Sequence, residues 1–415
     1  MDRTNSKRPT AHSLSDRIRT MSVFDTHSHM TDAAFPTYLA GEVGPFMRAD
    51  DLGGKTLAAL SREPGYPDNI RPLMKHLYRD TGHLAYKRAV TRGCRELYGF
   101  RGEWIDWDDR RLFARAAEAR SGGIAKLYLR VMELAGIERV LRLSSPWDDA
   151  IRLPVDRQAF LMYIDEAVVR RCGTPYPGKT AASDRRETLD EHLHGIGSLL
   201  SAAKAAGVVG LKVGLAARRS LRFEAVAQAR AASLFRLKRE LTPTEETAWE
   251  DFMMRWVAGE AGRQNLPLVF HTGFLWGQRT DLARTRSNLL HNLCTAFPDT
   301  RFVILHAAPY EGETAYLCAM FPNVYLDFTW TAMLSPTRFR TTFNAWIESI
   351  PESKFMWGSD SSGPEAWLGV TLETKELVAE ILCERVRRGQ MSEQSAFEFA
   401  TNALRDNAKR FYGLT

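Results

Sequence analysis

A series of short apolar runs, separated by segments with helical spacing, is the feature that most restricts the fold of this chain. The runs stand at residues 23–29, 135–141, 159–164, 208–213, 266–273, 301–306, 324–328 and 355–360. Strand-like runs that alternate with helices are typical of a parallel sheet covered by those helices. With 415 residues, the chain has room for a barrel of about 250 residues and for insertions. We therefore predict an α/β fold, a distorted (β/α)8 TIM barrel.

Three parts are expected along the chain. Residues 1–21 are rich in Ser, Thr and Arg and are predicted to be a flexible leader, while residues 22–415 are predicted to form the barrel. Between residues 32 and 134 no run has the character of a strand, so a helical insertion is expected after the first strand. An insertion at the carboxyl end of a barrel strand usually becomes a lid or a pocket wall. Within the predicted insertion, the candidates to face a ligand are His76, His83, Arg92, Trp104 and Trp107.

The charge pattern is mostly that of solvated helix faces. The chain has 56 Lys and Arg against 50 Asp and Glu, spread along helices rather than gathered into a block. This pattern does not resemble a nucleic-acid-binding module, and attraction of an anionic substrate is the weaker alternative interpretation of its mild positive charge.

The cysteine pattern and the termini favour an intracellular protein. The five cysteines are scattered without C-x-x-C spacing, which is typical of reduced thiols. No run approaches the roughly 20 apolar residues of a membrane span, and the first residues lack the apolar segment of a secretory signal. We expect a cytoplasmic protein without membrane partners, and its large helical surface is compatible with a homodimer.

Two histidines end the first apolar run. In the segment 23–29, alternation along a strand places His27 and His29 on the same face, where two imidazoles can converge on one point. Two neutral imidazole nitrogens held by a strand are a suitable beginning for a divalent metal site. Asp25 alternates with the two histidines and is expected to support them from below.

Three later runs end in further candidate ligands, namely His271, His306 and Asp360. Because the carboxyl ends of all strands lie on one face of a parallel barrel, these side chains are expected to meet the first pair. Zinc and manganese bind a few imidazoles and a carboxylate and keep a position open for water. The sequence therefore predicts a divalent metal site, with Zn²⁺ or Mn²⁺ as the ion. Such an ion would lower the pKa of water to about 7, and Asp360 would bind the ion, accept a proton, or both.

Lys212 is an unexpected cation inside the apolar run 208–213. Its side chain either points out between the layers or reaches the barrel mouth. The next loop contains Arg218 and Arg219, and Lys212 with one of these arginines would bind a carboxylate. Trp330 follows the run 324–328 and is a candidate to stack on a substrate, although packing at the rim is the commoner role for such a residue.

Together these motifs resemble the amidohydrolase superfamily, specifically its amidohydrolase-2 branch. The motifs occur in the order H-x-H, a strand lysine, F-H-T-G, L-H-A and G-S-D. The stretches 302–310, 322–327 and 357–360 are similar to the amidohydrolase-like domain that nodulin-type proteins fuse to a glutamine synthetase. The similarity covers most of residues 22–413 and is strongest after residue 208. It is specific for the superfamily and weak for the substrate.

The resemblance implies roles for the candidate residues. His27 and His29 would bind the metal, and His271 would be a third ligand or would face the substrate. Asp360 would be both a ligand and the general base. His306 would polarise the substrate or supply a further ligand.

The resemblance also concerns the two cations. Lys212 matches the position at which binuclear members carry a carboxylated lysine that bridges two metals, but this branch usually works with one metal. An unmodified Lys212 in contact with substrate, with Arg219 beside it, is therefore the favoured interpretation.

The implied activity is metal-dependent hydrolysis of a C–N amide bond or a lactone in a small carboxylate-bearing substrate, through metal-activated water. The same scaffold also supports non-oxidative decarboxylases and uronate isomerases, and fold alone does not separate these chemistries. A non-catalytic binding or scaffold protein is the third interpretation. It is disfavoured because every expected metal position carries a suitable residue.

Overall fold

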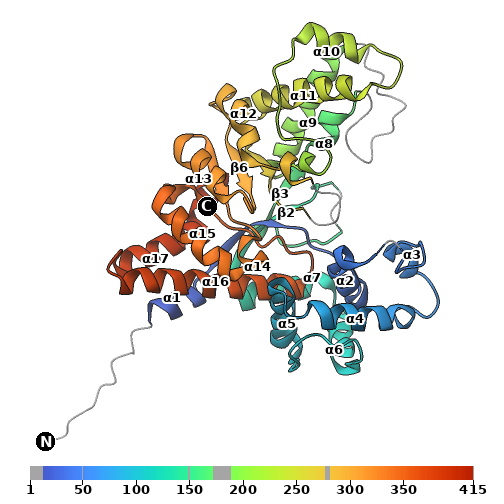
Figure 1. Ribbon diagram of the computed structural model, residues 1–415, viewed down its shortest axis with the longest axis vertical. Helices are drawn as coiled ribbons and strands as arrows, with labels where there is room; N and C mark the ends of the chain where they lie inside the picture. Colours follow the sequence, from blue (N-terminus) through green and yellow to red (C-terminus); the bar gives the residue numbers. More distant parts are fainter. Residues whose placement is uncertain (1–12, 49, 148–149, 172–187, 276–280, 415) are drawn as a thin grey trace, which may run out of the picture.

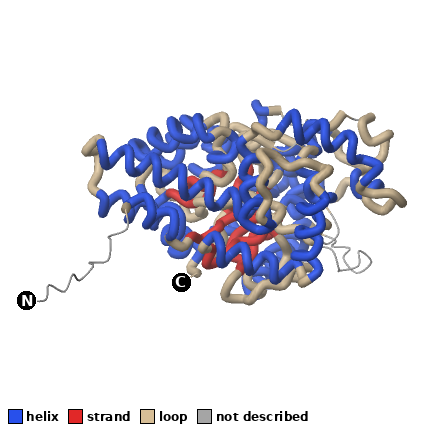
Figure 2. Tube along the Cα trace, turned by 90° about the horizontal axis from the view of Figure 1, so that it is seen from below, coloured by secondary structure: helices blue, strands red, loops and turns tan. Residues whose placement is uncertain are grey.

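The chain forms a barrel of eight parallel strands, as predicted. The computed structural model describes residues 13–48, 50–147, 150–171, 188–275 and 281–414. The strands follow one another in sequence order around the sheet, and each pairs in parallel with the next. Helices surround the strands, which occupy the centre of the molecule in Figure 2. Among the described residues, no helix is both long enough and apolar enough to cross a membrane.

The strands are β1 Val23–Ser28, β2 Ile137–Leu143, β3 Gln158–Tyr163, β4 Val208–Val213, β5 Leu268–His271, β6 Phe302–Leu305, β7 Val324–Asp327 and β8 Phe355–Met356. The helices before β4 are α1 Leu14–Thr20, α2 Phe35–Glu42, α3 Leu57–Leu60, α4 Arg71–Thr81, α5 Ala85–Tyr98, α6 Arg110–Ser121, α7 Ile124–Ala135, α8 Asp165–Val169 and α9 Leu189–Ala205. The later helices are α10 Gln228–Phe235, α11 Pro243–Arg263, α12 His291–Ala296, α13 Glu311–Met320, α14 Thr331–Leu334, α15 Pro336–Ser349, α16 Pro364–Arg387, α17 Glu393–Thr401 and α18 Asn407–Tyr412.

The barrel closes where the segment after β8 meets β1. The Thr26 amide donates to the Trp357 carbonyl at 3.1 Å, and the Asp360 amide donates to the His27 carbonyl at 2.8 Å. A further bond joins the His29 amide to the Ser361 carbonyl at 3.0 Å. These bonds continue the parallel pattern beyond the short strand β8, so the carboxyl ends of the first and last strands lie side by side.

Asp25 reinforces this closure from inside. Its Oδ1 accepts hydrogen bonds from the backbone amides of His27 at 3.0 Å and Ser359 at 2.9 Å. Its Oδ2 accepts one from the Trp367 indole at 2.5 Å. One buried carboxylate therefore joins β1, the segment after β8 and α16, which is the supporting role expected for it.

Apolar side chains fill the amino-terminal part of the barrel. Phe24, Val269 and Val303, each the second residue of its strand, belong to a cluster that also contains Phe411 and Tyr412 of α18. This packing closes one end of the barrel and leaves the carboxyl end for the polar side chains.

The predicted helical insertion is present between β1 and β2 and has its own apolar core. Phe35, Val90 and Trp107 are buried there, in a cluster separate from the main core. In Figure 1 its helices α2 to α6, coloured blue to cyan, lie together beside α14 and α16. The ion pair between Arg120 and buried Glu365, at 2.8 Å, links the insertion to the start of α16.

Two glycines let α5 approach α16 closely. A Cβ added at Gly93 would lie 1.9 Å from the Glu365 carbonyl oxygen, and one added at Gly369 would lie 1.8 Å from the Ala89 carbonyl oxygen. Real Cβ atoms do not approach a backbone atom so closely, so only glycine permits this contact in both directions. The insertion is therefore packed closely against helix α16 of the barrel.

The described part of the predicted leader is helical. Helix α1 begins after Ser13, whose side chain accepts a hydrogen bond from the Asp16 amide. Leu14 and Ile18, one turn apart, are buried, and α1 packs against α16 and α17. Residues 1–12 of the expected leader lie outside the described residues. The apolar residues Leu14 and Ile18 are the sequence signal for a helical turn within this leader, and the structure has a helix there.

We predict that Gly369→Ala separates α5 from α16 and lowers the free energy of unfolding by about 1–3 kcal/mol. Denaturant unfolding would measure the change. Gly312→Ala in α13 is the matched control, because a Cβ there meets nothing within 4 Å. It should leave stability unchanged or raise it by up to about 1 kcal/mol. Equal effects of the two substitutions would contradict the close contact.

Candidate metal centre

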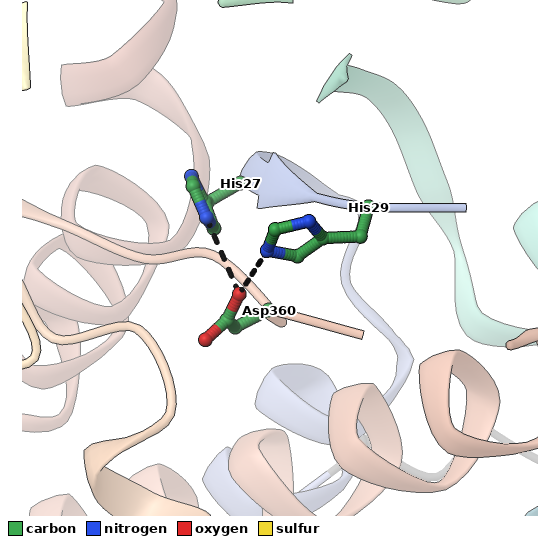
Figure 3. Close-up of side chains that lie close together, drawn as sticks. All are labelled: His27, His29 and Asp360. Carbon is green, nitrogen blue, oxygen red and sulfur yellow. Dashed lines mark ion pairs between the residues drawn. The ribbon is translucent and has the colours of Figure 1, made fainter. Parts of the chain in front are cut away.

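Three side chains at the junction of β1 and the segment after β8 form a candidate metal site. Figure 3 shows the imidazoles of His27 and His29 directed at the same carboxylate oxygen of Asp360. The Nε2 atoms of His27 and His29 lie 3.2 Å and 3.0 Å from Asp360 Oδ1. One ligand atom from each residue lies within 4.8 Å of the other two, a spacing suitable for one metal ion. The structure thus brings together three of the four residues predicted to bind metal.

His271 and His306 form the adjoining part of the site. His271 is the last residue of β5, and His306 directly follows β6. His306 Nε2 lies 3.2 Å from His271 Nδ1 and 3.8 Å from Asp360 Oδ2. All the histidines and the aspartate that the sequence placed at strand ends therefore lie around the carboxyl end of the barrel.

A backbone carbonyl lies beside one ring nitrogen of each of these two histidines. His271 Nε2 lies 2.8 Å from the Phe274 carbonyl oxygen, and His306 Nδ1 lies 3.2 Å from the Thr329 carbonyl oxygen. Because a carbonyl only accepts, each of these contacts is a hydrogen bond when that ring nitrogen carries the proton. The facing atoms, His271 Nδ1 and His306 Nε2, then both present lone pairs. Two lone pairs 3.2 Å apart repel each other unless a proton or a cation lies beside them.

Burial keeps the histidines neutral. Desolvation, aided by the charge of Lys212, lowers the pKa of His27 to about 3. Desolvation likewise lowers the pKa of His306 to about 4 and that of His271 well below its usual value. Although burial alone would raise the pKa of Asp360, its hydrogen bonds to His27 and His29 hold it well below the usual range. Neutral imidazoles beside an ionised carboxylate are the protonation states that a divalent cation needs.

Several strand ends adopt a strained backbone. Met30, His306, Trp330 and Asp360 have φ values of 42°, 70°, 64° and 51° although none is glycine. Each such residue costs of order 1–3 kcal/mol, and such residues persist where the surrounding structure holds them. Here they turn the chain sharply just after β1, β6, β7 and β8, which directs the side chains to the mouth of the barrel.

A cavity of about 710 Å³ opens beside these side chains. It is lined by His29, His271 and Asp360 of the cluster, by Lys212, Asp165, Tyr163 and Trp330 from the barrel, and by Thr31, Thr37, Tyr38, Glu42 and Tyr86 from the segments after β1. The candidate metal site is therefore in contact with a space large enough for a small-molecule ligand.

Lys212 reaches this cavity. It lies in β4, is only 1% exposed, and its Nζ has no hydrogen-bond partner among the described residues. Burial lowers the pKa of Lys212 to about 8, while the charges of Asp360, Asp327 and Asp165 oppose that shift. The lysine is therefore still a cation at neutral pH and has no direct partner for its charge.

Trp330 and Arg219 occupy different positions. Trp330 lines the cavity, with its ring centroid 5.6 Å from that of His306. Arg219 pairs with Glu250, with 3.1 Å between Nη1 and Oε2, and also bonds Asp251 of α11. Because its guanidinium is held there and does not line the cavity, Arg219 is not kept as a carboxylate ligand.

The insertion contributes residues that the sequence did not single out. None of the five candidates named within it lines the cavity. Trp107 is buried in the insertion's own core, and Arg92 pairs with Glu376 at 2.6 Å. The cavity is instead lined by Tyr38, Glu42 and Tyr86, among others. Glu42, the last residue of α2, is a charged residue after a mainly apolar segment, but the sequence does not indicate which way this helix docks.

The donor set fits a divalent metal. Four imidazoles and one carboxylate converge at the carboxyl end of the barrel, and burial keeps His27, His271 and His306 neutral. Mixed nitrogen and oxygen donors suit zinc and manganese. His27, His29 and Asp360 would hold the ion, with His271 or His306 available as a further ligand.

Comparison with known proteins supports this interpretation. Residues 198–414, more than half of the chain, match the amidohydrolase-2 family, described as Amidohydrolase. Protein fluG of Emericella nidulans is 28% identical over 160 residues, which are 38% of this chain but only 18% of that protein.

Solved structures show the same fold over nearly the whole chain. A Lactobacillus casei protein inferred to be a metal-dependent hydrolase has a TM-score of 0.67 at 19% identity, covering 96% of this chain and 97% of its own. The uronate isomerase of Thermotoga maritima has a TM-score of 0.73 at 14% identity and covers 96% of both chains. The glucuronate isomerase of Caulobacter crescentus has a TM-score of 0.71 at 14% identity, and the match covers 97% of this chain and 93% of its own. At these identities the similarity concerns the fold.

We predict that Zn²⁺ stabilises the metal-depleted protein by about 2.7 kcal/mol at a free concentration 100 times its Kd. His29→Ala should abolish the accompanying rise in Tm, because it removes one of three converging ligands from a side chain that is 42% exposed. Differential scanning fluorimetry measures the shift. His194→Ala, an exposed histidine of α9, should keep the wild-type response. An equal response in His29→Ala would place the ion elsewhere.

Proposed function

The chain belongs to the amidohydrolase-2 family, and from this premise we propose that it is a metal-dependent hydrolase. The proposed reaction is cleavage of a C–N amide bond, or of a lactone, in a small carboxylate-bearing substrate. The ion proposed is zinc, with manganese as the alternative. The observation that carries the proposal is the convergence of His27, His29 and Asp360 beside a cavity.

When bound, a divalent ion supplies Lewis acidity, which lowers the pKa of water to about 7 and polarises a carbonyl. His27, His29 and Asp360 would hold the ion. With their protons on the nitrogens beside the backbone carbonyls, His271 and His306 present acceptors to the site. The polarising role that the resemblance implies for His306 needs its proton on Nε2 instead.

Asp360 is the proposed proton carrier. Its carboxylate is ionised and partly accessible, with 13% of the side chain exposed. It would accept the proton that the attacking water loses and return that proton to the leaving nitrogen, so that water is divided between the two products. Neutral His306, with Nε2 at 3.8 Å from Asp360 Oδ2, is a second acceptor within reach.

Lys212 is the proposed partner of the substrate carboxylate. A buried ammonium without a hydrogen-bond partner is costly, and an anionic ligand in the cavity would supply both a charge and acceptors. Lys212 comes from β4, across the barrel from β8 and β1, so the substrate would extend from Lys212 towards the metal-binding side chains. Trp330 forms part of the cavity wall and is available to pack on the substrate.

Isomerisation of a uronate is the second candidate. It is favoured by the structural similarity to two isomerases over more than nine-tenths of both chains, insertion included. The two candidates differ in their use of water. Hydrolysis in H₂¹⁸O incorporates ¹⁸O into the product, whereas conversion of an aldose to a ketose incorporates none through bond cleavage.

We predict that the zinc-loaded protein hydrolyses members of a panel of N-acyl amino acids and carboxylated lactones, with one ¹⁸O per turnover by mass spectrometry. Asp360→Asn should lower kcat by at least about 100-fold, because proton transfer contributes about 10²–10⁴-fold. Conversion of glucuronate or galacturonate without hydrolysis of any panel member would replace the hydrolase proposal by the isomerase.

We predict that Lys212→Met lowers kcat/KM for a carboxylated substrate by about 10- to 100-fold, since a hydrogen bond to a charged group contributes about 1.5–3 kcal/mol. For the same substrate with its carboxylate converted to a neutral amide, the change should be below about 3-fold. Steady-state kinetics measure both values. Lys126→Met, on the exposed surface of α7, is the control and should alter neither. Equal losses on both substrates would remove Lys212 from carboxylate binding.

A further inference from the structure

Two residues of α2 and one from the segment before α16 form a second polar group in the cavity wall. They are Tyr38, Glu42 and Ser362, and we refer to them as the α2 subsite. All three line the cavity that contains Lys212 and Asp360. None of them is needed for the metal-binding arrangement or the proton transfer described above.

Tyr38 presents an unused hydroxyl. The residue is only 4% exposed, and its hydroxyl has no hydrogen-bond partner among the described residues. Its ring packs against the backbone of Gly363, where an added Cβ would lie 2.4 Å from a ring carbon. The ring is therefore held in place, and the phenol is a fixed polar group inside a cavity wall. A buried hydroxyl without a partner is costly unless a ligand supplies one.

Glu42 lies on the same helix, one turn after Tyr38, and its charge is already countered. The Lys87 Nζ lies 3.9 Å from Glu42 Oε2 and also donates to the Glu42 backbone carbonyl. Ser362 donates its hydroxyl to Glu42 Oε1 at 3.1 Å, and Tyr86 also hydrogen bonds the carboxylate. The carboxylate keeps further acceptor positions for a ligand, since two oxygens offer about four.

The charges select the kind of ligand group. Because Lys87 already balances the charge of Glu42, an ammonium or a carboxylate group would find no unbalanced counter-charge there. A neutral hydroxyl needs no counter-charge. Tyr38 and Glu42 are four positions apart and lie on the same face of α2, so one hydroxyl can donate to the Glu42 carboxylate and accept from the Tyr38 phenol.

We propose that the α2 subsite binds a hydroxyl group of the substrate and thereby makes the enzyme selective for hydroxylated carboxylic acids. The inference rests on the proposed function, because it takes the substrate carboxylate to lie at Lys212. In the closed barrel, β4 lies across the mouth from β1 and the segment after β8. The carboxylate and the hydroxyl are thus bound on opposite sides of the cavity, and the reacting bond lies between them, close to the metal-binding residues.

Isothermal titration of the zinc-loaded protein with four series of probe acids tests this assignment. The series are unbranched alkanoates, ω-hydroxyalkanoates, ω-aminoalkanoates and α,ω-dicarboxylates, each with four to eight carbons. At the best chain length, the ω-hydroxyalkanoate should bind about 10-fold more tightly than the alkanoate, as expected for one or two satisfied hydrogen bonds. Neither the amine nor the second carboxylate should give this gain.

Tyr38→Phe should reduce the hydroxyl preference to about 2-fold or less while leaving alkanoate binding unchanged. Tyr78→Phe is the matched control, because the Tyr78 hydroxyl donates to the Leu39 carbonyl at 2.8 Å inside the insertion and does not line the cavity. It should keep the full preference. Circular dichroism and Tm establish that both variants fold.

The outcomes separate the inference from the proposed function. If alkanoates and ω-hydroxyalkanoates bind equally and both are lost in Lys212→Met, the carboxylate site stands and the α2 subsite is refuted. Tighter binding of the amine or dicarboxylate series also overturns it, as does a hydroxyl preference that survives in Tyr38→Phe. If no probe acid binds at any length, the carboxylate requirement of the proposed function falls, and the inference falls with it.

Discussion

The closure between β1 and the segment after β8 is the constraint on which the site depends. Asp25 accepts hydrogen bonds from two backbone amides, one in each of these segments, and from the Trp367 indole of α16. Burial raises the pKa of Asp25 to about 6, and these hydrogen bonds limit the shift. Because His27, His29 and Asp360 extend from the two segments joined in this way, the separation of the candidate metal ligands is set by the backbone itself.

The insertion forms one wall of the cavity beside this cluster. Helix α5 is held against α16 by contacts that only glycine allows, and the Arg120–Glu365 pair adds a buried link at 2.8 Å. Helix α2, which carries Tyr38 and Glu42, packs in the same apolar cluster as α5. On the barrel side, strained residues such as His306 and Asp360, with φ values of 70° and 51°, turn the chain so that their side chains point to the barrel mouth.

The barrel and the convergence of the candidate ligands were predictable because strand ends in a parallel barrel share one face. Each candidate ligand stands at or near the end of an apolar run that is recognisable as a strand in the sequence, namely His27, His29, His271, His306 and Asp360. The position of Arg219 in the loop after β4 did not indicate where its side chain would lie, because its partners Glu250 and Asp251 are 31 and 32 positions away in helix α11. The α2 subsite was not predictable either, since it depends on how a helix docks and not on any local period.

Anomalous diffraction from crystals of the zinc-loaded protein would locate a metal ion bound between the first and last strands. We predict one strong zinc peak bonded to His27, His29 and Asp360, at about 2.0–2.2 Å from nitrogen and oxygen ligands. A second peak bridged through Lys212 would replace the single-ion mechanism by a binuclear one. A wild-type protein with no peak at this site under zinc-replete conditions would contradict the account.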